Sequence, residues 1–511
     1  MPSVHFDSVS FSFLDAVPLF DDQSLDLGPG WTGLVGENGA GKTTLLRLLC
    51  GELEPESGRI RLEPRNARVL LCPQLVERLP EDVVRFAESV DGEARALHGR
   101  LDLGPEEIRR WPTLSPGQRK RWQIGAALAA RPDVLMLDEP SNHLDGQARA
   151  LLVEALLSHD GVGLVVSHDR ELLDSLTVRT LRFHRGAVRL YRGGYSEARQ
   201  EWEAERAGAV EGHRRIAGER ERARKQLADA RRERDSAEKS RSTSSRMRNR
   251  SDSDQRSIMA STKAAWAEGR ASRRVQLARR EVSRLDDLDS EAQLVKERGR
   301  SIGVDWVPAP MPVLARLDIP ELKAGERRLL GSTQLVLRRE DRVRIAGANG
   351  AGKTTLLEAL RAETSVPKER LLYLPQELSE EEAAGLLEQL RELPAEERNA
   401  ALAIVAALGS DPGRLMESES PSPGEARKLS LAMGLARQAW VLFLDEPTNH
   451  LDLPSVERLE EALAEYPGAL VLVTHDEGLA ERCAGTTWVI QNGELGTAPP
   501  VPPRRGRDER N

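Results

Sequence analysis

Short apolar runs along the chain each end at a polar or charged position, as buried strands of an α/β protein do. Residues 134–138 (VLMLD) and 441–445 (VLFLD) are apolar up to their last position, and a glutamate follows each run. Residues 31–35 and 163–166 are further apolar runs of strand length, and the LLRLLC stretch after the first of them has helical spacing. Open α/β sheets bind ligands at the C-terminal ends of their strands. The pattern therefore predicts an α/β fold with chemistry at strand ends.

A charged middle segment separates the two parts of the chain that carry these runs. Residues 196–240 and 258–298 are almost free of glycine and proline, and their apolar positions are sparse. This pattern predicts two exposed helices that form an antiparallel hairpin. Each helix would be roughly 60 Å long at ~1.5 Å per residue. Residues 75–113 also have a helical pattern.

The turn of this predicted hairpin is strongly basic. Residues 241–250 contain four arginines and no acidic residue. A solvated connecting loop is one interpretation, but arginines gathered at the end of a long hairpin favour contact with RNA or phosphate. The residues predicted to make that contact are Arg246, Met247, Arg248 and Arg250.

The second half of the chain repeats the first. The twelve-residue word VLMLDEPSNHLD returns as VLFLDEPTNHLD with ten identical positions, and the corresponding motifs are separated by 302 to 311 residues. A nearly constant offset indicates a duplicated domain. We predict a first repeat over residues 1–195, a helical linker over 196–300 with its tip near 241–257, a second repeat over 301–495, and a disordered tail over 496–511.

A glycine-rich loop follows the first predicted strand of each repeat. Residues 36–43 read GENGAGKT and residues 347–354 read GANGAGKT, and both match the phosphate-binding pattern G-x-x-x-x-G-K-[ST] between a strand and a helix. The glycines let backbone N–H groups close around phosphate oxygens at a helix N-terminus. Lys42 and Lys353 would reach the β- and γ-phosphates, and Thr43 and Thr354 would ligate Mg²⁺.

Each repeat also has an acidic pair, a glutamine and a histidine at predicted strand ends. Asp138 and Asp445 suit Mg²⁺, which prefers oxygen ligands, while Glu139 and Glu446 can act as general bases toward a water. A strand followed by a solvated acidic turn is the alternative for one such pair, but the duplication argues against it. Gln74 and Gln376 could bind the metal or be ordinary loop residues, and His168 and His475 are predicted to be catalytic.

Two further motifs leave alternatives open. Ser115-Pro-Gly117 and Ser422-Pro-Gly424 each precede a predicted helix, where a serine can bind an anion or simply cap the helix. Phe13, in a segment of alternating aromatics, either stacks on a nucleotide base or packs in the core.

Composition and charge narrow the class of protein. The chain has 511 residues, which suggests two to four domains, and no apolar run approaches the ~18–20 residues that span a bilayer. Its three cysteines lack metal-binding spacing and indicate reduced thiols in a cytosolic protein. The net charge is −8, yet residues 211–300 carry 25 Lys and Arg against 16 Asp and Glu, which leaves −17 on the rest. The basic middle segment is therefore expected to meet a polyanion.

Phosphate loop, glutamine, Ser-x-Gly turn, acidic pair and histidine, in that order and twice, resemble the ATP-binding cassette superfamily. Two cassettes, a charged helical linker and the word YRGGY at residues 191–195 resemble its ABC-F class of ribosome-associated ATPases. The resemblance implies a cytoplasmic monomer whose two cassettes enclose two Mg·ATP. Each phosphate loop would then face the signature turn of the other cassette. It also implies binding at the ribosomal E site, with the linker directed toward the P-site tRNA and the peptidyl-transferase centre.

The resemblance assigns ATP binding in the first cassette to Gly36, Glu37, Asn38, Gly39, Ala40, Gly41, Lys42, Thr43, Thr44, Gln74, Ser115, Gly117 and Gln118. In the second cassette it assigns ATP binding to Gly347, Ala348, Asn349, Gly350, Ala351, Gly352, Lys353, Thr354, Thr355, Gln376, Ser422, Gly424 and Glu425. The expected Mg²⁺ ligands are Thr43, Gln74 and Asp138, and Thr354, Gln376 and Asp445.

Some features depart from the class or fit another one. The signature turns read LSPGQ and PSPGE where LSGGQ is usual, so Pro116 and Pro423 remove a backbone donor. No aromatic residue that could stack on adenine precedes the second phosphate loop. A transporter ATPase with a separate membrane chain is the main alternative, although it would not require a basic hairpin between cassettes. A DNA-repair or structural-maintenance ATPase would carry its insertion within a cassette.

Overall fold

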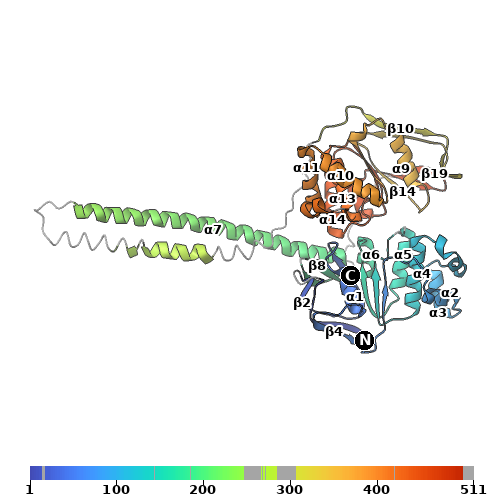
Figure 1. Ribbon diagram of the computed structural model, residues 1–511, viewed down its shortest axis with the longest axis horizontal. Helices are drawn as coiled ribbons and strands as arrows, with labels where there is room; N and C mark the ends of the chain where they lie inside the picture. Colours follow the sequence, from blue (N-terminus) through green and yellow to red (C-terminus); the bar gives the residue numbers. More distant parts are fainter. Residues whose placement is uncertain are drawn as a thin grey trace, which may run out of the picture. The chain divides into compact units, whose positions relative to one another are not determined.

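The computed structural model describes residues 1–13, 18–142, 144, 146–184, 186–246, 266, 269–270, 272–284, 306–418 and 420–498, with the backbone alone for 210, 213 and 237–246. The chain forms two compact units. One comprises Met1–Ala198 with Gly299–Asn511, and the other comprises Arg199–Arg298. The first unit contains both repeats, and the second contains most of the charged middle segment (Figure 1).

The first repeat is built on a six-stranded sheet in the order β5-β6-β7-β3-β8-β9. All neighbours run parallel except β8 and β9, which form an antiparallel hairpin. The strands are β3 (Gly30–Gly36), β5 (Val69–Cys72), β6 (Val134–Asp138), β7 (Val162–Val166), β8 (Arg179–His184) and β9 (Ala187–Arg192). A separate antiparallel sheet has the order β2-β1-β4, with β1 (Ser3–Phe11), β2 (Phe20–Leu27) and β4 (Ser57–Glu63).

Helices connect these parallel strands, as the crossover geometry of a parallel sheet requires. They are α1 (Lys42–Leu49), α2 (Glu81–Glu88), α3 (Gly92–Arg100), α4 (Pro116–Ala129), α5 (Gly146–Leu156) and α6 (Arg170–Leu176), with a 3₁₀ segment η1 (Pro105–Thr113). The region 75–113 was predicted to be helical, and it is helical in three pieces. Asp91 caps the second piece by accepting the Ala94 N–H, and Gly104 precedes the last piece, so the helical pattern is interrupted at both places.

The second repeat has the same sheet order, β15-β16-β17-β14-β18-β19, which confirms the duplicated α/β fold. Its strands are β14 (Arg342–Gly347), β15 (Leu371–Leu374), β16 (Val441–Asp445), β17 (Ala469–Val473), β18 (Thr486–Gln491) and β19 (Glu494–Ala498). Two antiparallel pairs accompany this sheet: β10 (Val313–Ile319) with β13 (Thr333–Arg338), and β11 (Leu322–Ala324) with β12 (Arg327–Leu330). Its helices are α9 (Lys353–Ala362), η2 (Lys368–Arg370), α10 (Glu380–Glu392), α11 (Ala395–Ala407), α12 (Pro412–Glu417), α13 (Pro423–Ala436), α14 (Leu453–Glu465) and α15 (Glu477–Cys483).

Burial of the central strands holds the site-bearing ends in place. Every residue of β6, β7, β16 and β17 is buried, including the aspartates that end β6 and β16. In the first repeat, Trp122 of α4 is completely buried and stacks edge-on against Phe86 of α2, with ring centroids 5.9 Å apart. The Trp122 indole N–H also donates to Glu107. These contacts orient the helix whose N-terminus carries the first Ser-x-Gly turn.

The second unit contains a helical hairpin, as the charge pattern predicts. Helix α7 (Tyr195–Arg246) begins in the first unit and continues through the second, and residues 272–284 are helical as well (Figure 1). Arg274 pairs with Glu233 at 2.8 Å. The pKa of Arg284 is raised by its hydrogen bond to Glu281 and by the charge of Glu219. Residue numbers therefore increase along the second helix as those of the facing residues of α7 decrease. The two helices are antiparallel.

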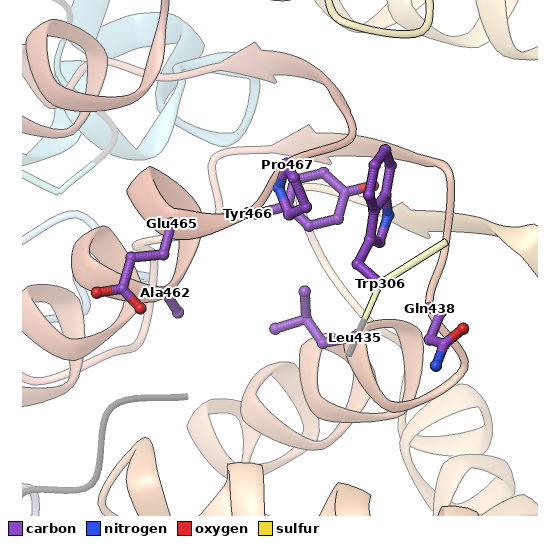
Figure 2. A pocket seen from close by; sticks show the side chains of 7 residues that line it. All are labelled: Trp306, Leu435, Gln438, Ala462, Glu465, Tyr466 and Pro467. Atoms are coloured by element: carbon purple, nitrogen blue, oxygen red, sulfur yellow. The ribbon is translucent and has the colours of Figure 1, made fainter. Parts of the chain in front are cut away.

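The chain re-enters the second repeat at Trp306. Its indole lies in a small, mainly apolar pocket beside Leu435 of α13 and next to Tyr466 and Pro467, which follow α14 (Figure 2). None of the phosphate-loop residues lines this pocket, so it is separate from the nucleotide-binding motifs. The three cysteines are free. Across the part of the chain that the structure describes, no helix combines the length and the apolar character needed to cross a membrane.

Candidate active site

Both glycine-rich loops have the geometry of phosphate-binding loops. Each joins a strand to a helix, β3 to α1 and β14 to α9, and the residue before each helix is a glycine in the left-handed region, Gly41 with φ 100° and Gly352 with φ 102°. A Cβ atom on Gly41 would lie 2.8 Å from the Phe20 ring. Glycine is therefore required there for both conformation and space. No side chain caps either helix, which leaves their first N–H groups available to an anion.

The lysine of each loop lies across its own loop. Lys42 donates from Nζ to the carbonyl oxygens of Gly36 (2.7 Å) and Glu37 (3.0 Å). Lys353 donates in the same way to Gly347 (2.8 Å) and Ala348 (3.2 Å). Burial lowers the pKa of Lys42. Both ammonium groups are thus held against the loops that are predicted to bind phosphate.

A hydroxyl and a carboxylate meet beside each loop. The Thr43 hydroxyl donates to Asp138 Oδ2 at 3.2 Å, and the Thr354 hydroxyl donates to Asp445 Oδ2 at 2.6 Å. Burial raises the pKa of both aspartates, so a bound cation would relieve their desolvation. Hydroxyl and carboxylate oxygens are hard ligands of the kind that Mg²⁺ prefers. These residues therefore fit the expected metal.

The two glutamates share an unusual backbone conformation and the same carboxylate contacts. Glu139 and Glu446 each have positive φ, 47° and 46°, a conformation that is costly outside glycine and is often found at functional sites. In each residue Oε2 accepts a hydrogen bond from the backbone N–H of the site histidine at 3.3 Å. The donor is His168 for Glu139 and His475 for Glu446. Oε1 of both glutamates is buried and accepts no well-aligned hydrogen bond from the described residues, and the imidazole Nε2 of the site histidine lies beside it. A water could donate a hydrogen bond to that atom.

Burial shifts the pKa values of the two glutamates and of His168. It raises the pKa of Glu139 to about 8 and that of Glu446 to about 7, and it lowers the pKa of His168 to about 3. The His168 Nε2 lies 3.1 Å from Glu139 Oε1, while the corresponding distance from His475 to Glu446 is 3.6 Å. A carboxyl with a pKa near neutrality is suited to exchanging a proton with water.

A buried glutamate with a raised pKa should also destabilise the nucleotide-free protein at high pH. Its unfolded pKa is near 4.5, so stability is complete below that value and is lost as pH rises toward 8. At about 1.4 kcal/mol per pKa unit, the loss is of the order of 2–4 kcal/mol by pH 8. We expect Glu139→Gln to melt at the wild-type temperature at pH 5 and at a higher temperature at pH 8. Equal melting temperatures of the two proteins at pH 8 would contradict this reading.

The two Ser-x-Gly turns cap their helices. The Ser115 hydroxyl accepts the N–H of Gln118, whose side chain accepts the N–H of Ser115, and Ser422 and Glu425 form the same reciprocal pair. Pro116 and Pro423 occupy the first helical position, where a missing N–H costs nothing. The prolines are therefore compatible with the turn, and the capping interpretation of both serines is confirmed. Their contact with ATP stays a prediction.

The first phosphate loop contacts the second repeat. The Asn38 N–H donates to Asp452 Oδ2 at 2.7 Å, and its side-chain amide donates to the His450 carbonyl at 3.2 Å. A Cβ atom on Gly424 would lie 2.7 Å from that carbonyl and 3.7 Å from the Asn38 amide. The second signature turn thus lies next to the first phosphate loop. The reciprocal contact would join the second phosphate loop to the first repeat. His143 and Asp145, which correspond to His450 and Asp452, lie outside the described residues.

One large cleft brings most of the predicted residues together, but its lining does not include Gly36, Glu37, Ala40, Gly347, Ala348, Ala351 or Glu425. In the first repeat its lining includes Asn38, Gly39, Gly41, Lys42, Thr43, Thr44, Gln74, Asp138, Glu139 and His168. In the second repeat it includes Asn349, Gly350, Gly352, Lys353, Thr354, Thr355, Gln376, Ser422, Gly424, Asp445, Glu446 and His475. Of the first signature turn, Pro116 lines the cleft while Ser115, Gly117 and Gln118 do not. Phe13 also lines it and is largely exposed, so it remains available to stack on a base.

Two residues of this cleft region were missed from the sequence. Asp452 closes the repeated word NHLD, and that repetition was a signal that could have identified it. Arg149 of α5 pairs with Asp169 at 3.1 Å and donates to the His475 carbonyl at 3.2 Å, which connects the histidine segments of the two repeats. Its counterpart at the same offset is Val456, so repetition gave no signal there. Met247, Arg248 and Arg250 of the predicted tip lie outside the described residues, and Arg246 is described by its backbone alone.

Known proteins resemble the chain over nearly its full length. The family model described as ABC transporter matches residues 20–142 and 330–449. The tylosin resistance ATP-binding protein TlrC of Streptomyces fradiae is 31% identical, covering 93% of this chain and 95% of that protein. The ribosome protection protein VmlR of Bacillus subtilis is 28% identical over 91% of this chain and 82% of its own.

A solved structure titled RNase-L Inhibitor shares the fold. It has a TM-score of 0.59 and 18% identity, and the match covers 98% of this chain and 91% of that one. Its likeness supports the tandem arrangement of two α/β domains. Both repeats are therefore cassettes of the ATPase type, and the chain belongs to the ABC-F class of ATP-binding cassette proteins.

Proposed function

We propose that the protein hydrolyses ATP at two sites and uses the resulting closure to act on the ribosome. It would bind the E site and direct its linker toward the P-site tRNA and the peptidyl-transferase centre. The outcome would be modulation of translation or protection from a ribosome-targeting antibiotic. The observation that carries this proposal is a single cleft lined by both phosphate loops, both acidic pairs and both histidines, in a chain whose middle forms a charged helical hairpin.

The residues of each cassette divide the work of hydrolysis. Lys42 and Lys353, with the loop N–H groups, would hold the β- and γ-phosphates. Mg²⁺ would be held by Thr43, Gln74 and Asp138 in one site and by Thr354, Gln376 and Asp445 in the other. When bound, Mg²⁺ neutralises negative charge on the phosphates.

The Oε1 atoms of Glu139 and Glu446, which face the imidazole rings of His168 and His475, are the natural acceptors for a proton from the attacking water. His168 and His475 would orient that water and the transferred phosphoryl group. The backbone N–H of each histidine fixes its glutamate through Oε2, and the imidazole Nε2 lies next to Oε1, so glutamate and histidine would act as one unit.

The sites are expected to be shared between cassettes. The proximity of Gly424 and Asp452 to Asn38 supports a first site in which Lys42 and Glu139 face Ser422 and Gly424. In the second site Lys353 and Glu446 would face Ser115 and Gly117. ATP would then close the two cassettes of one chain on each other, and the protein would work as a cytoplasmic monomer.

The relatives and the linker charge support the ribosome as partner. One relative is named a ribosome protection protein and another a tylosin resistance protein. Residues 211–300 carry 25 basic and 16 acidic residues in a chain of net charge −8, which suits contact with RNA phosphates. A transporter subunit would have no use for this basic segment.

Binding to ribosomes should require ATP and should weaken steeply with salt. ATP would close the two cassettes and change the direction of the linker, so the closed form would present the RNA-binding surface. If a few arginines contact phosphates, raising salt from about 50 to about 200 mM should lower affinity roughly tenfold or more. Co-sedimentation with purified ribosomes measures this effect, with ADP and nucleotide-free protein as controls. Equal binding in all nucleotide states, or recovery of the protein with membranes, would count against the proposal.

A further inference from the structure

A buried cation occupies the same position of the signature helix in both cassettes. Lys120 lies on α4 and Arg427 on α13, 307 residues apart, which is the offset of the signature serines. Their side chains are only 4% and 1% exposed. A buried charge is costly unless it is well bonded, so its presence at both positions calls for partners of matching importance.

Lys120 bonds to backbone at the two strand ends that carry site residues. Its Nζ donates to the carbonyl oxygens of Pro73 (2.5 Å) and Asp138 (3.0 Å), with Cys72 at 3.5 Å. Pro73 immediately precedes Gln74, and Asp138 immediately precedes Glu139. One ammonium group therefore joins the signature helix to the glutamine segment and to the acidic pair.

Arg427 makes the same two connections in the second cassette. Its Nη1 donates to the Glu446 carbonyl at 3.1 Å, and its Nη2 donates to the Gln376 carbonyl. The chemistry differs, because a guanidinium has two donor arms where an ammonium has one centre. The pattern of connections is nevertheless the same. Filling buried space does not require a cation with these partners, and duplication has kept the connections while the residue type changed.

We propose that Lys120 and Arg427 are positioning residues that tie each signature helix to the glutamine segment and acidic pair of its own cassette. This inference rests on the proposed function, in which the signature turn of one cassette closes on the ATP of the other. The turn next to Asn38 begins α13, and α13 carries Arg427 one turn further on. Closure of α13 on the first ATP would thus move Gln376 and Glu446 of the second site. Charge-assisted hydrogen bonds in a dry interior make this connection stiff.

The geometry predicts that each cation affects ATP hydrolysis at one site only. Lys120→Met should impair the first site, which contains Gln74 and Glu139, while Arg427→Met should impair the second. Single-turnover hydrolysis by excess enzyme separates them without requiring the cleft to reopen. In Glu446→Gln protein the second site is inactive, so the measured hydrolysis comes from the first site. In Glu139→Gln protein it comes from the second site.

We expect Lys120→Met to lower first-site hydrolysis about tenfold and second-site hydrolysis less than about twofold, with nucleotide affinity unchanged. Arg427→Met should show the opposite pattern. The swaps Lys120→Arg and Arg427→Lys should restore rates to within about twofold. Arg121→Met is the matched control, since Arg121 lies on the same helix and donates to the carbonyls of Leu101 and Asp102. Lys120→Gln is a milder second variant should the methionine variant fail to fold.

The outcomes separate this inference from the function on which it rests. Equal losses at both sites, or a loss in Arg121→Met as large as in Lys120→Met, would reduce the cations to a structural role and overturn the inference. Unchanged first-site hydrolysis in folded Lys120→Met or Lys120→Gln would overturn it as well. If wild-type protein hydrolyses no ATP, the proposed function itself fails.

Discussion

Replacing Glu139 and Glu446 together with glutamine should lower ATP turnover by about 10²-fold or more while ATP binding remains. Each glutamate directly follows a fully buried strand, in a strained backbone conformation, with one carboxylate oxygen facing the imidazole of the site histidine. Glutamine keeps the shape and cannot accept the proton. The phosphate loops, Thr43 and Thr354 are untouched, so the protein should accumulate with ATP bound and the cleft closed.

Steady-state phosphate release and retention of ATP after gel filtration measure the two halves of this prediction. Glu88→Gln with Glu392→Gln is a matched control, because both residues are exposed and end helices α2 and α10. It makes the same charge change away from the cleft and should retain normal turnover. Near-normal hydrolysis in the Glu139/Glu446 variant would remove both residues from the catalytic role.

Replacing residues 241–257 with a short Gly/Ser turn should abolish the effect on translation, including any protection from a drug. Five arginines and Met247 fall in this stretch, and α7 alone would extend roughly 75 Å at ~1.5 Å per residue, long enough to reach a distant RNA surface. The cassettes bind ATP without it, so basal turnover should stay within about twofold of wild type.

In vitro translation with and without a ribosome-targeting antibiotic measures this loss. A variant that replaces Arg246, Arg248 and Arg250 with glutamine keeps the length of the stretch and should show a similar loss if the charge is what matters. A variant without the stretch that still protects or modulates ribosomes would place the function in the cassettes. Residues 241–257 would then be only a solvated connection.

The duplicated motifs made much of the fold and site predictable. An apolar run ending in Asp-Glu indicates a buried strand that delivers carboxylates to a sheet edge, and the glycine loops lie between a predicted strand and a predicted helix. Because both patterns occur twice in the same order, the two α/β cassettes followed. The sparse apolar positions of the middle segment likewise gave the helical hairpin, whose pairing of Arg274 with Glu233 is a surface contact.

Contacts between distant segments were not predictable in the same way. Arg149 reaches the His475 carbonyl across 326 residues, and nothing in its local sequence marks it. Lys120 and Arg427 looked like ordinary polar positions of an amphipathic helix, whereas tertiary packing buries them against strand ends. Pro116 and Pro423 illustrate the converse. The sequence shows that each proline removes a backbone N–H donor. Only the observed helix boundary shows that this N–H, in the first helical turn, would have had no partner within the helix.

Chemical probing of ribosomal RNA in ribosomes mixed with the ATP-loaded Glu139→Gln/Glu446→Gln protein tests the central claim most directly. The account predicts protection of nucleotides in the E site and at the peptidyl-transferase centre. The second set should disappear when residues 241–257 are replaced, while the first set remains. Absence of protection at both places, with ATP demonstrably bound, would contradict the claim that this ATPase acts on the ribosome.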